Sequence, residues 1–124
     1  MKKILVIVLM LAMVLVTASL LGCQNEDGQE EEVVSIGIIQ IVEHPALDAA
    51  RDGFIDALKD AGYEDGKNVS LDIQNAQGDT NNLSTISDRF VSNKVDLVLA
   101  IATPSAQSIA GKTTEIPILG TAIT

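Results

Sequence analysis

The chain has 124 residues, of which 47 % are apolar and only 2 % aromatic, and its formal net charge is −9. This length allows one domain at most. The acidity argues against nucleic acid and anionic membrane surfaces as partners, because neutralising phosphate groups requires clustered Lys and Arg side chains.

The first 22 residues differ in composition from the rest: they hold 17 apolar residues, two lysines and no acid. The two lysines precede the apolar run Ile4–Val16, as in a secretory signal. The segment closes on Leu20-Leu21-Gly22-Cys23, which resembles the bacterial lipobox, where the signal is cut before a cysteine that receives a diacylglycerol. An uncleaved membrane anchor is the alternative. The small residue and cysteine at the end of the run favour the lipoprotein signal.

Cys23 is the only cysteine, so no disulfide framework exists. Each buried methylene of an acyl chain on it would contribute about 0.8 kcal/mol to membrane anchoring. The next nine residues, QNEDGQEEE, include five acids and no apolar residue, which predicts an extended tether or, alternatively, an acidic recognition tail. We expect residues 1–22 to be a signal peptide and residues 23–32 to be the lipidated cysteine with its tether. The protein would lie outside the cytoplasm, anchored to the cell membrane by lipid.

The folded part begins at Val33. Residues 33–41, VVSIGIIQI, form a β-branched apolar run that predicts a strand buried on both faces. Apolar residues then recur at helical spacing from Leu47 to Ala61, with Pro45 suited to the first turn and Gly62 to a left-handed stop. Strict alternation over residues 69–74 predicts an edge strand with one wet face.

The second half repeats this order of elements. Leu83, Ile86 and Phe90 have helical spacing, and residues 95–102, VDLVLAIA, read as a central strand. Thr103-Pro104-Ser105 opens a third helix, and residues 116–123 contain a fourth strand. The fold class is therefore α/β: a three-layer arrangement with helices flanking a parallel sheet of order 2-1-3-4. A ligand crevice is expected outside the carboxyl ends of strands one and three.

Motifs for catalysis, phosphate binding and metal binding are missing from the loops at that edge. No glycine-rich phosphate loop follows the first strand, and one histidine among scattered carboxylates lacks the spacing of metal ligands. Ser105 does not lie in a nucleophile elbow. We predict no catalytic residue, no cofactor and no metal, and a protein that is not an enzyme.

The start of the third helix is the most suggestive loop. The hydroxyls of Thr103 and Ser105, with the free N–H groups of a helix start, would suit the carboxylate of a small ligand. Alternatively, one of these hydroxyls only caps the helix.

Polar residues also follow the first two strands. His44 either caps the helix beside Pro45 or lines the crevice, and Glu43 would meet a ligand ammonium group or remain an exposed acid. Asn75, Gln77 and Asp79 offer ligand partners or serve ordinary turn chemistry.

Five segments together resemble a known family: the lipobox, IGIIQIVEHPALDAARDGFIDAL, AGYEDGKNVSLDIQNAQGD, VDLVLAIATPSAQ and IPILGTAIT. They are similar to the amino-terminal lobe of ABC-transporter substrate-binding proteins of the tryptophan/tyrosine type, which have the type I periplasmic-binding-protein fold. The resemblance implies a receptor that closes two lobes around an aromatic or other apolar amino acid and delivers it to a membrane permease. The ligand-facing positions it implies are Gln40, Glu43, His44, Gln77, Thr103, Pro104, Ser105 and Ala106.

The chain departs from this family in length, because two lobes need roughly 300 residues. We therefore expect residues 33–124 to be an incomplete amino-terminal lobe that binds solute weakly or not at all when alone. One alternative is a structural or interaction lipoprotein completed by dimerisation through its open sheet edge. Another is a sugar receptor of the same fold, which would rely on aromatic stacking, although Phe54, Tyr63 and Phe90 lie away from the ligand edge.

Overall fold

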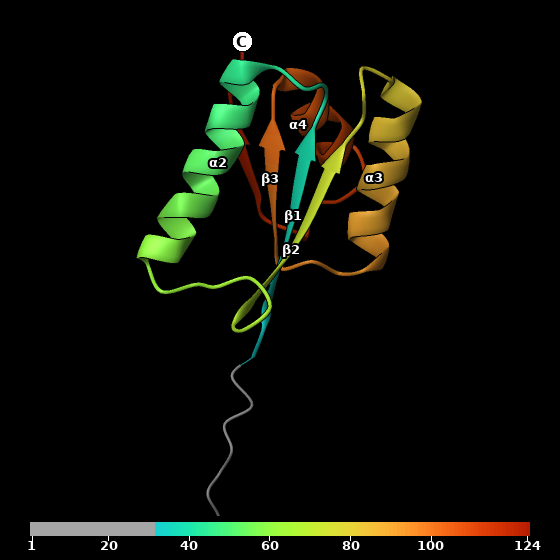
Figure 1. Cartoon of the computed structure of the whole chain (residues 1–124). Coiled ribbons are helices and arrows are strands. Elements are labelled where there is room, and N and C mark those ends of the chain that lie inside the picture. Colours follow the sequence, from blue (N-terminus) through green and yellow to red (C-terminus); the bar gives the residue numbers. More distant parts are fainter. Residues whose placement is uncertain (1–31) are drawn as a thin grey trace, which may run out of the picture. The chain divides into compact units, whose positions relative to one another are not determined.

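The computed structural model describes residues 32–124, which fall within one compact unit, Glu31–Thr124. The predicted signal peptide and nearly all of the tether lie outside the described residues. Strands and helices alternate along the chain (Figure 1). They are β1 (Val34–Gln40), α2 (Pro45–Asp60), β2 (Val69–Asn75), α3 (Thr80–Ser92), β3 (Leu97–Ile101), α4 (Thr103–Ala110) and β4 (Ile118–Thr121).

The strands form one parallel sheet of order β2-β1-β3-β4, which confirms the predicted topology. β1 lies in the middle, with Ile38 opposite Ile73 of β2 and Leu99 of β3. The carboxyl ends of β1, β2 and β3 meet at one edge of the sheet, the upper edge in Figure 1. The loops that follow these strands are therefore brought together there.

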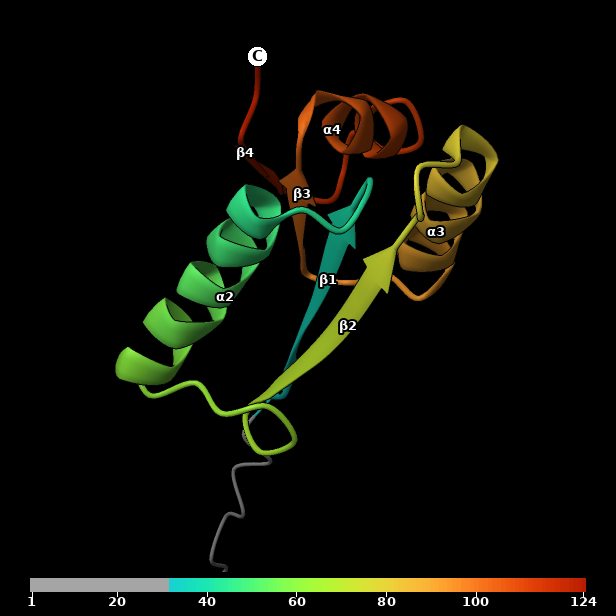
Figure 2. The same cartoon turned by 45° about the horizontal axis from the view of Figure 1, so that its top comes forward.

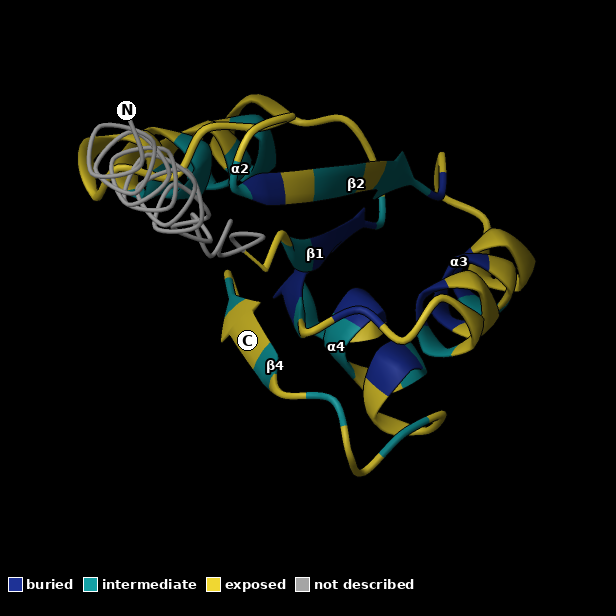
Figure 3. Ribbon diagram, turned by 90° about the horizontal axis from the view of Figure 1, so that it is seen from below, coloured by how far each residue is buried: buried dark blue, intermediate teal, exposed yellow. Residues whose placement is uncertain are grey.

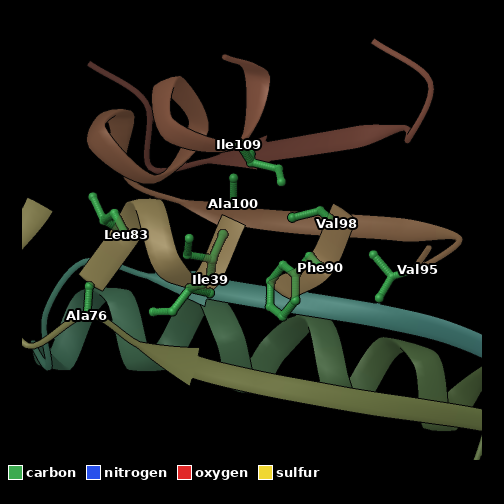
Figure 4. Close-up of a cluster of buried hydrophobic side chains, with 9 residues drawn as sticks. Ile39, Ala76, Leu83, Phe90, Val95, Val98, Ala100 and Ile109 are labelled. Atoms are coloured by element: carbon green, nitrogen blue, oxygen red, sulfur yellow. The ribbon is translucent and has the colours of Figure 1, made fainter. Parts of the chain in front are cut away.

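Helices cover both faces of the sheet: α2 lies on one face, and α3 and α4 lie on the other (Figures 2 and 3). Under α3 and α4 is a core of nine buried residues, eight of them labelled in Figure 4. A second core under α2 contains Ile36, Ile38, Val69, Leu99 and Ile101. Because the central strands are buried on both faces, β1 reads as an unbroken apolar run.

Local signals in the sequence account for the helix ends. His44 is the N-cap of α2, ahead of Pro45, and its Nδ1 accepts a hydrogen bond from Ala46 N–H at 3.2 Å. Asp79 caps α3 by accepting from Asn81 N–H at 2.7 Å. Gly62 follows α2 with a φ of +91°, which confirms the predicted left-handed stop.

The prediction for β2 was only partly right. The strand does lie at an edge of the sheet. However, Ile73, which the alternation placed on the buried face, is 45 % exposed, whereas Asp72 on the predicted wet face is half-buried. Asp72 accepts hydrogen bonds from Gln74 and Arg89. Ile73 lies outside the cluster in which Val69 and Leu71 of the same strand pack with side chains of α2.

Within residues 32–124, no helix combines the length and the apolar character needed to cross a bilayer.

Candidate functional site

The loops after β1 and β2 are joined to each other by backbone hydrogen bonds at the carboxyl edge of the sheet. Ala76 N–H donates to Gln40 O at 2.9 Å, and Gly78 N–H donates to Ile41 O at 2.7 Å. Gln77, between these two donors, has a φ of +55°, in the left-handed region that side chains other than glycine rarely adopt. The loop after β1, residues 41–44, and the loop after β2, residues 76–79, therefore form one connected surface, which we call the wall.

This wall contains a hollow of about 240 Å³ lined by Val42, Glu43, Asn75 and Gln77. It brings together Glu43 and Gln77, two of the predicted ligand residues. A carboxylate beside amide groups and one apolar side chain suits a small ligand that carries a cation or several hydrogen-bond donors. Larger hollows lie elsewhere on the described surface, so size alone does not single this one out.

Gln40, at the end of β1, lies beneath this wall and is only 1 % exposed. Its Nε2 donates to Val42 O at 2.7 Å and to Asp48 Oδ1 at 2.8 Å. Its Oε1 is buried without a hydrogen-bond partner. In this arrangement the side chain holds the loop from below and does not face solvent.

Residues His44, Asn75 and Asp79 serve local structure. His44 and Asp79 cap helices, and Asn75 Oδ1 accepts from Gln77 N–H at 2.7 Å. These are the turn and capping roles that the sequence left open. His44 is nevertheless exposed beside Glu43 at the carboxyl edge.

The backbone at the start of α4 is strained. Ala102 has φ +75° and ψ 154°, a conformation almost restricted to glycine. It is the N-cap of α4, but no side chain caps this helix, so the alternative in which Thr103 or Ser105 is the cap is wrong. Among the described residues, neither Thr103 N–H nor Ser105 N–H donates a hydrogen bond. These two donors at a helix N-terminus suit an anion.

The two hydroxyls at this helix start are placed differently. Thr103 Oγ1 accepts from Thr124 N–H at 3.0 Å and donates to Thr124 O at 3.2 Å, so the chain after β4 already engages it. Ser105 is fully buried, and its Oγ has no partner. Pro104 is exposed and Ala106 half-buried. Of the two free backbone donors, only Thr103 N–H belongs to a residue with exposed surface, because Ser105 is buried.

Some features of this edge were missed from the sequence. Val42 lines the hollow, and Ala102 N–H donates to Thr121 O at 3.0 Å, which links the loops after β3 and β4. The positive φ of Ala102 had no signal, because alanine gives no indication of a left-handed backbone. Val42 could have been found from its position next to Glu43 on the ligand-side loop.

The described part of the chain offers neither a metal-binding cluster nor aromatic rings at the carboxyl edge. Residues 32–124 contain no group of three or more His, Cys, Asp or Glu side chains that could hold a metal ion. Phe90 is a buried residue in the last turn of α3, and Tyr63 lies in the loop after α2, so these rings lie away from the carboxyl edge as expected. The clear pKa changes also lie elsewhere: hydrogen bonds from Ser35 lower the pKa of Asp96, and Lys67 lowers that of Glu64.

Comparisons with known proteins agree with this architecture. The chain is 46 % identical to the tyrosine-binding protein of Clostridioides difficile, over 99 % of this chain and 38 % of that relative. Its structure resembles the ligand-free, open form of CD0873, a substrate-binding protein with adhesive properties from Clostridium difficile, with a TM-score of 0.73 and 52 % identity over 74 % of this chain. It also resembles a Streptococcus pneumoniae ABC domain in complex with L-Trp, with a TM-score of 0.69 and 42 % identity over 73 % of this chain.

The chain spans only part of these relatives, namely 38 % of the tyrosine-binding protein, 31 % of CD0873 and 30 % of the L-Trp-bound protein. Over residues 35–124 it matches the family described as ABC transporter substrate binding protein. This match covers most of the chain and all of the sheet except Val34. The chain belongs to the family of ABC-transporter substrate-binding proteins.

Proposed function

We propose that residues 33–124 form the amino-terminal lobe of an extracytoplasmic receptor that binds an aromatic amino acid and delivers it to an ABC permease. Family membership supports the receptor role. The solute class follows from two relatives, one named for tyrosine and one solved with L-Trp. The single observation that carries the proposal is the hollow in which Glu43 and Gln77 meet at the carboxyl edge.

The site chemistry matches the two charged ends of an amino acid. Glu43 would attract the ammonium group, and the free N–H group of Thr103, at the start of the helix that also holds the buried Ser105, would bind the carboxylate. His44 and Gln77 flank the first of these positions, Pro104 and Ala106 flank the second, and Gln40 supports the wall from beneath. Binding and release by lobe closure need no catalytic group, so the proposal assigns no enzymatic activity to the protein.

We further propose that residues 1–22 are a lipoprotein signal and that lipid on Cys23 holds the receptor at the membrane by way of the acidic segment 23–32. Labelled palmitate should enter the protein, and Cys23→Ser should abolish the label and release the protein from membranes. Because Cys23 is the only cysteine, no other thiol can substitute for it. Retention of the label in Cys23→Ser would disprove the anchor.

The solute can be tested in a chimera in which residues 33–124 replace the matching segment of the C. difficile tyrosine-binding protein. Calorimetric titration with tyrosine, tryptophan and alanine should show tight binding of an aromatic amino acid only. Glu43→Gln should weaken it about 10-fold or more, as expected for a hydrogen bond to a charged group. Glu115→Gln is the matched control, because this exposed carboxylate precedes β4 at the opposite edge of the sheet.

The outcomes separate the parts of the proposal. A folded chimera that binds none of the three amino acids would contradict the solute class. Equal affinities for the Glu43→Gln and Glu115→Gln variants would remove Glu43 from the site.

A further inference from the structure

We infer that Gln40 is a positioning residue: it sets the loop Val42–His44 from beneath and does so at a cost to the stability of the fold. Where this concerns a ligand, it rests on the proposed function, because Glu43 and His44 lie on this loop. The positioning itself is a property of the described residues alone.

The amide of Gln40 connects three elements. It lies at the end of β1, and its Nε2 reaches both Val42 O in the loop and Asp48 Oδ1 in the first turn of α2, at 2.7 and 2.8 Å. Asp48 N–H in turn donates to His44 O at 2.9 Å. Hydrogen bonds thus hold the loop on both sides of Glu43: Val42 O accepts from Gln40, and His44 O accepts from Asp48 N–H.

Among the described residues, the only other polar side-chain contact of this stretch is the local cap in which His44 Nδ1 accepts from Ala46 N–H. Glu43 makes no hydrogen bond or ion pair there, and Val42, Glu43 and His44 are all exposed. Within residues 32–124, Gln40 therefore contributes the only side-chain hydrogen bond that crosses from the sheet to the loop Val42–His44.

The orientation of the amide leaves one oxygen unsatisfied. Val42 O and Asp48 Oδ1 are both acceptors, so the NH₂ group must face them and Oε1 must point away. Oε1 is then buried without a partner, an arrangement that costs free energy and is uncommon in folded proteins. A leucine of similar volume would avoid this cost and would lose the loop contacts, so the glutamine serves the loop and not the core.

This reasoning makes an unusual prediction for Gln40→Leu. The two released acceptors can turn to water, because Val42 is exposed and Asp48 is only half-buried. Global stability should therefore stay level or rise while the loop loses order. If Gln40 served only the fold, Gln40→Leu would lower the global stability and the order of the loop together.

The experiment is hydrogen exchange on the detergent-purified full chain, followed at the amides of Ala46, Leu47 and Asp48, which all donate to His44. In Gln40→Leu their protection should fall about 10-fold or more, while amides of β3 and the midpoint of thermal unfolding are retained. Asp48→Ala tests the same link from the exposed side and should act alike. Asp48→Asn keeps an acceptor oxygen and should preserve the protection.

Gln74→Leu is the matched control. Gln74 lies near the end of the neighbouring strand, and its Nε2 donates to Asp72 Oδ1 at 2.6 Å, but its side chain makes no hydrogen bond to the loop Val42–His44 among the described residues. The inference is supported if Gln40→Leu and Asp48→Ala loosen the loop and Gln74→Leu does not. Unchanged loop exchange in Gln40→Leu, equal loosening by Gln74→Leu, or loss of the whole fold with no effect of Asp48→Ala would overturn it. Because no ligand takes part, its failure leaves the receptor function standing, and the failure of the receptor function leaves this inference standing.

Discussion

The ring of Phe90 packs directly on the backbone of Gly37: a Cβ at Gly37 would lie 2.6 Å from Cδ2 of Phe90. Phe90 comes from α3 and is fully buried in the core shown in Figure 4. The contact explains a glycine in the middle of β1, where it would otherwise weaken the strand. The missing side chain provides the space for the ring.

Gly37→Ala should therefore destabilise the fold by about 1–3 kcal/mol through overpacking. Urea unfolding of the two proteins measures the difference. Gly53→Ala is the control, because nothing lies within 4 Å of a Cβ at Gly53. There, in the middle of α2, alanine should stabilise by about 0.5–1 kcal/mol. If Phe90→Leu fails to relieve part of the cost of Gly37→Ala, the clash is not its source.

Ala102→Gly should stabilise the lobe, because glycine adopts φ +75° and ψ 154° without strain. Relief of a strained backbone amounts to about 1–3 kcal/mol, reduced by the extra freedom that glycine has in the unfolded chain. Thermal unfolding measures the gain. Ala57→Gly, at an exposed site in α2, should instead cost about 1 kcal/mol. A loss of stability in both variants would show that the turn holds no strain.

The sequence predicted the topology because each link in the argument was local. Apolar runs marked the central strands, Pro45 and Gly62 marked the ends of one helix, and alternating strands and helices leave few ways to build a parallel sheet. Ile73 shows the limit of this reasoning. Alternation says which face a side chain points to, but not whether a helix covers that face.

The candidate site was less predictable than the topology, because local sequence patterns do not report contacts between distant segments. The sequence placed Gln40 at the end of a strand, and Glu43 and Gln77 in loops, at the correct edge. However, the Gln40 amide is engaged by Asp48, eight residues further along the chain. Thr103 looks like a helix cap, yet it bonds to Thr124, a partner that no local rule indicates. Contacts between distant segments decide which polar groups remain free.

Asp96 gives a prediction for pH dependence. Its Oδ2 accepts from Ser35 N–H at 2.7 Å and from Ser35 Oγ–H at 2.9 Å, and these bonds hold the pKa of Asp96 below its ordinary value of 3.8. Because the pKa is lowered in the folded state, the stabilisation is fully present above pH 3.8 and is lost as the pH falls through the folded-state pKa.

Asp96→Asn should thus lower stability at neutral pH and make little difference in acid. The carboxylate is exposed, so the loss should stay below about 1 kcal/mol. Thermal unfolding as a function of pH measures it. Asp88→Asn removes a surface ion pair to Lys112 and should change stability by less than about 0.5 kcal/mol. An Asp96→Asn deficit that persists unchanged in acid would contradict this account.

Asp65 protects the open edge of β2, and its removal should promote association between copies of the chain. Its Oδ1 accepts from the outward-facing Leu71 N–H at 2.9 Å, next to the bond from Gly66 N–H to Val69 O. In Asp65→Ala the freed N–H of an edge strand becomes available to another chain. Light scattering should then show a concentration-dependent increase in mass. Asp60→Ala removes the same charge at an exposed site on α2 that makes no hydrogen bond among the described residues. If Asp60→Ala associates equally, the lost charge is responsible and not the opened edge; if neither variant associates, the backbone bond from Gly66 suffices to protect the strand.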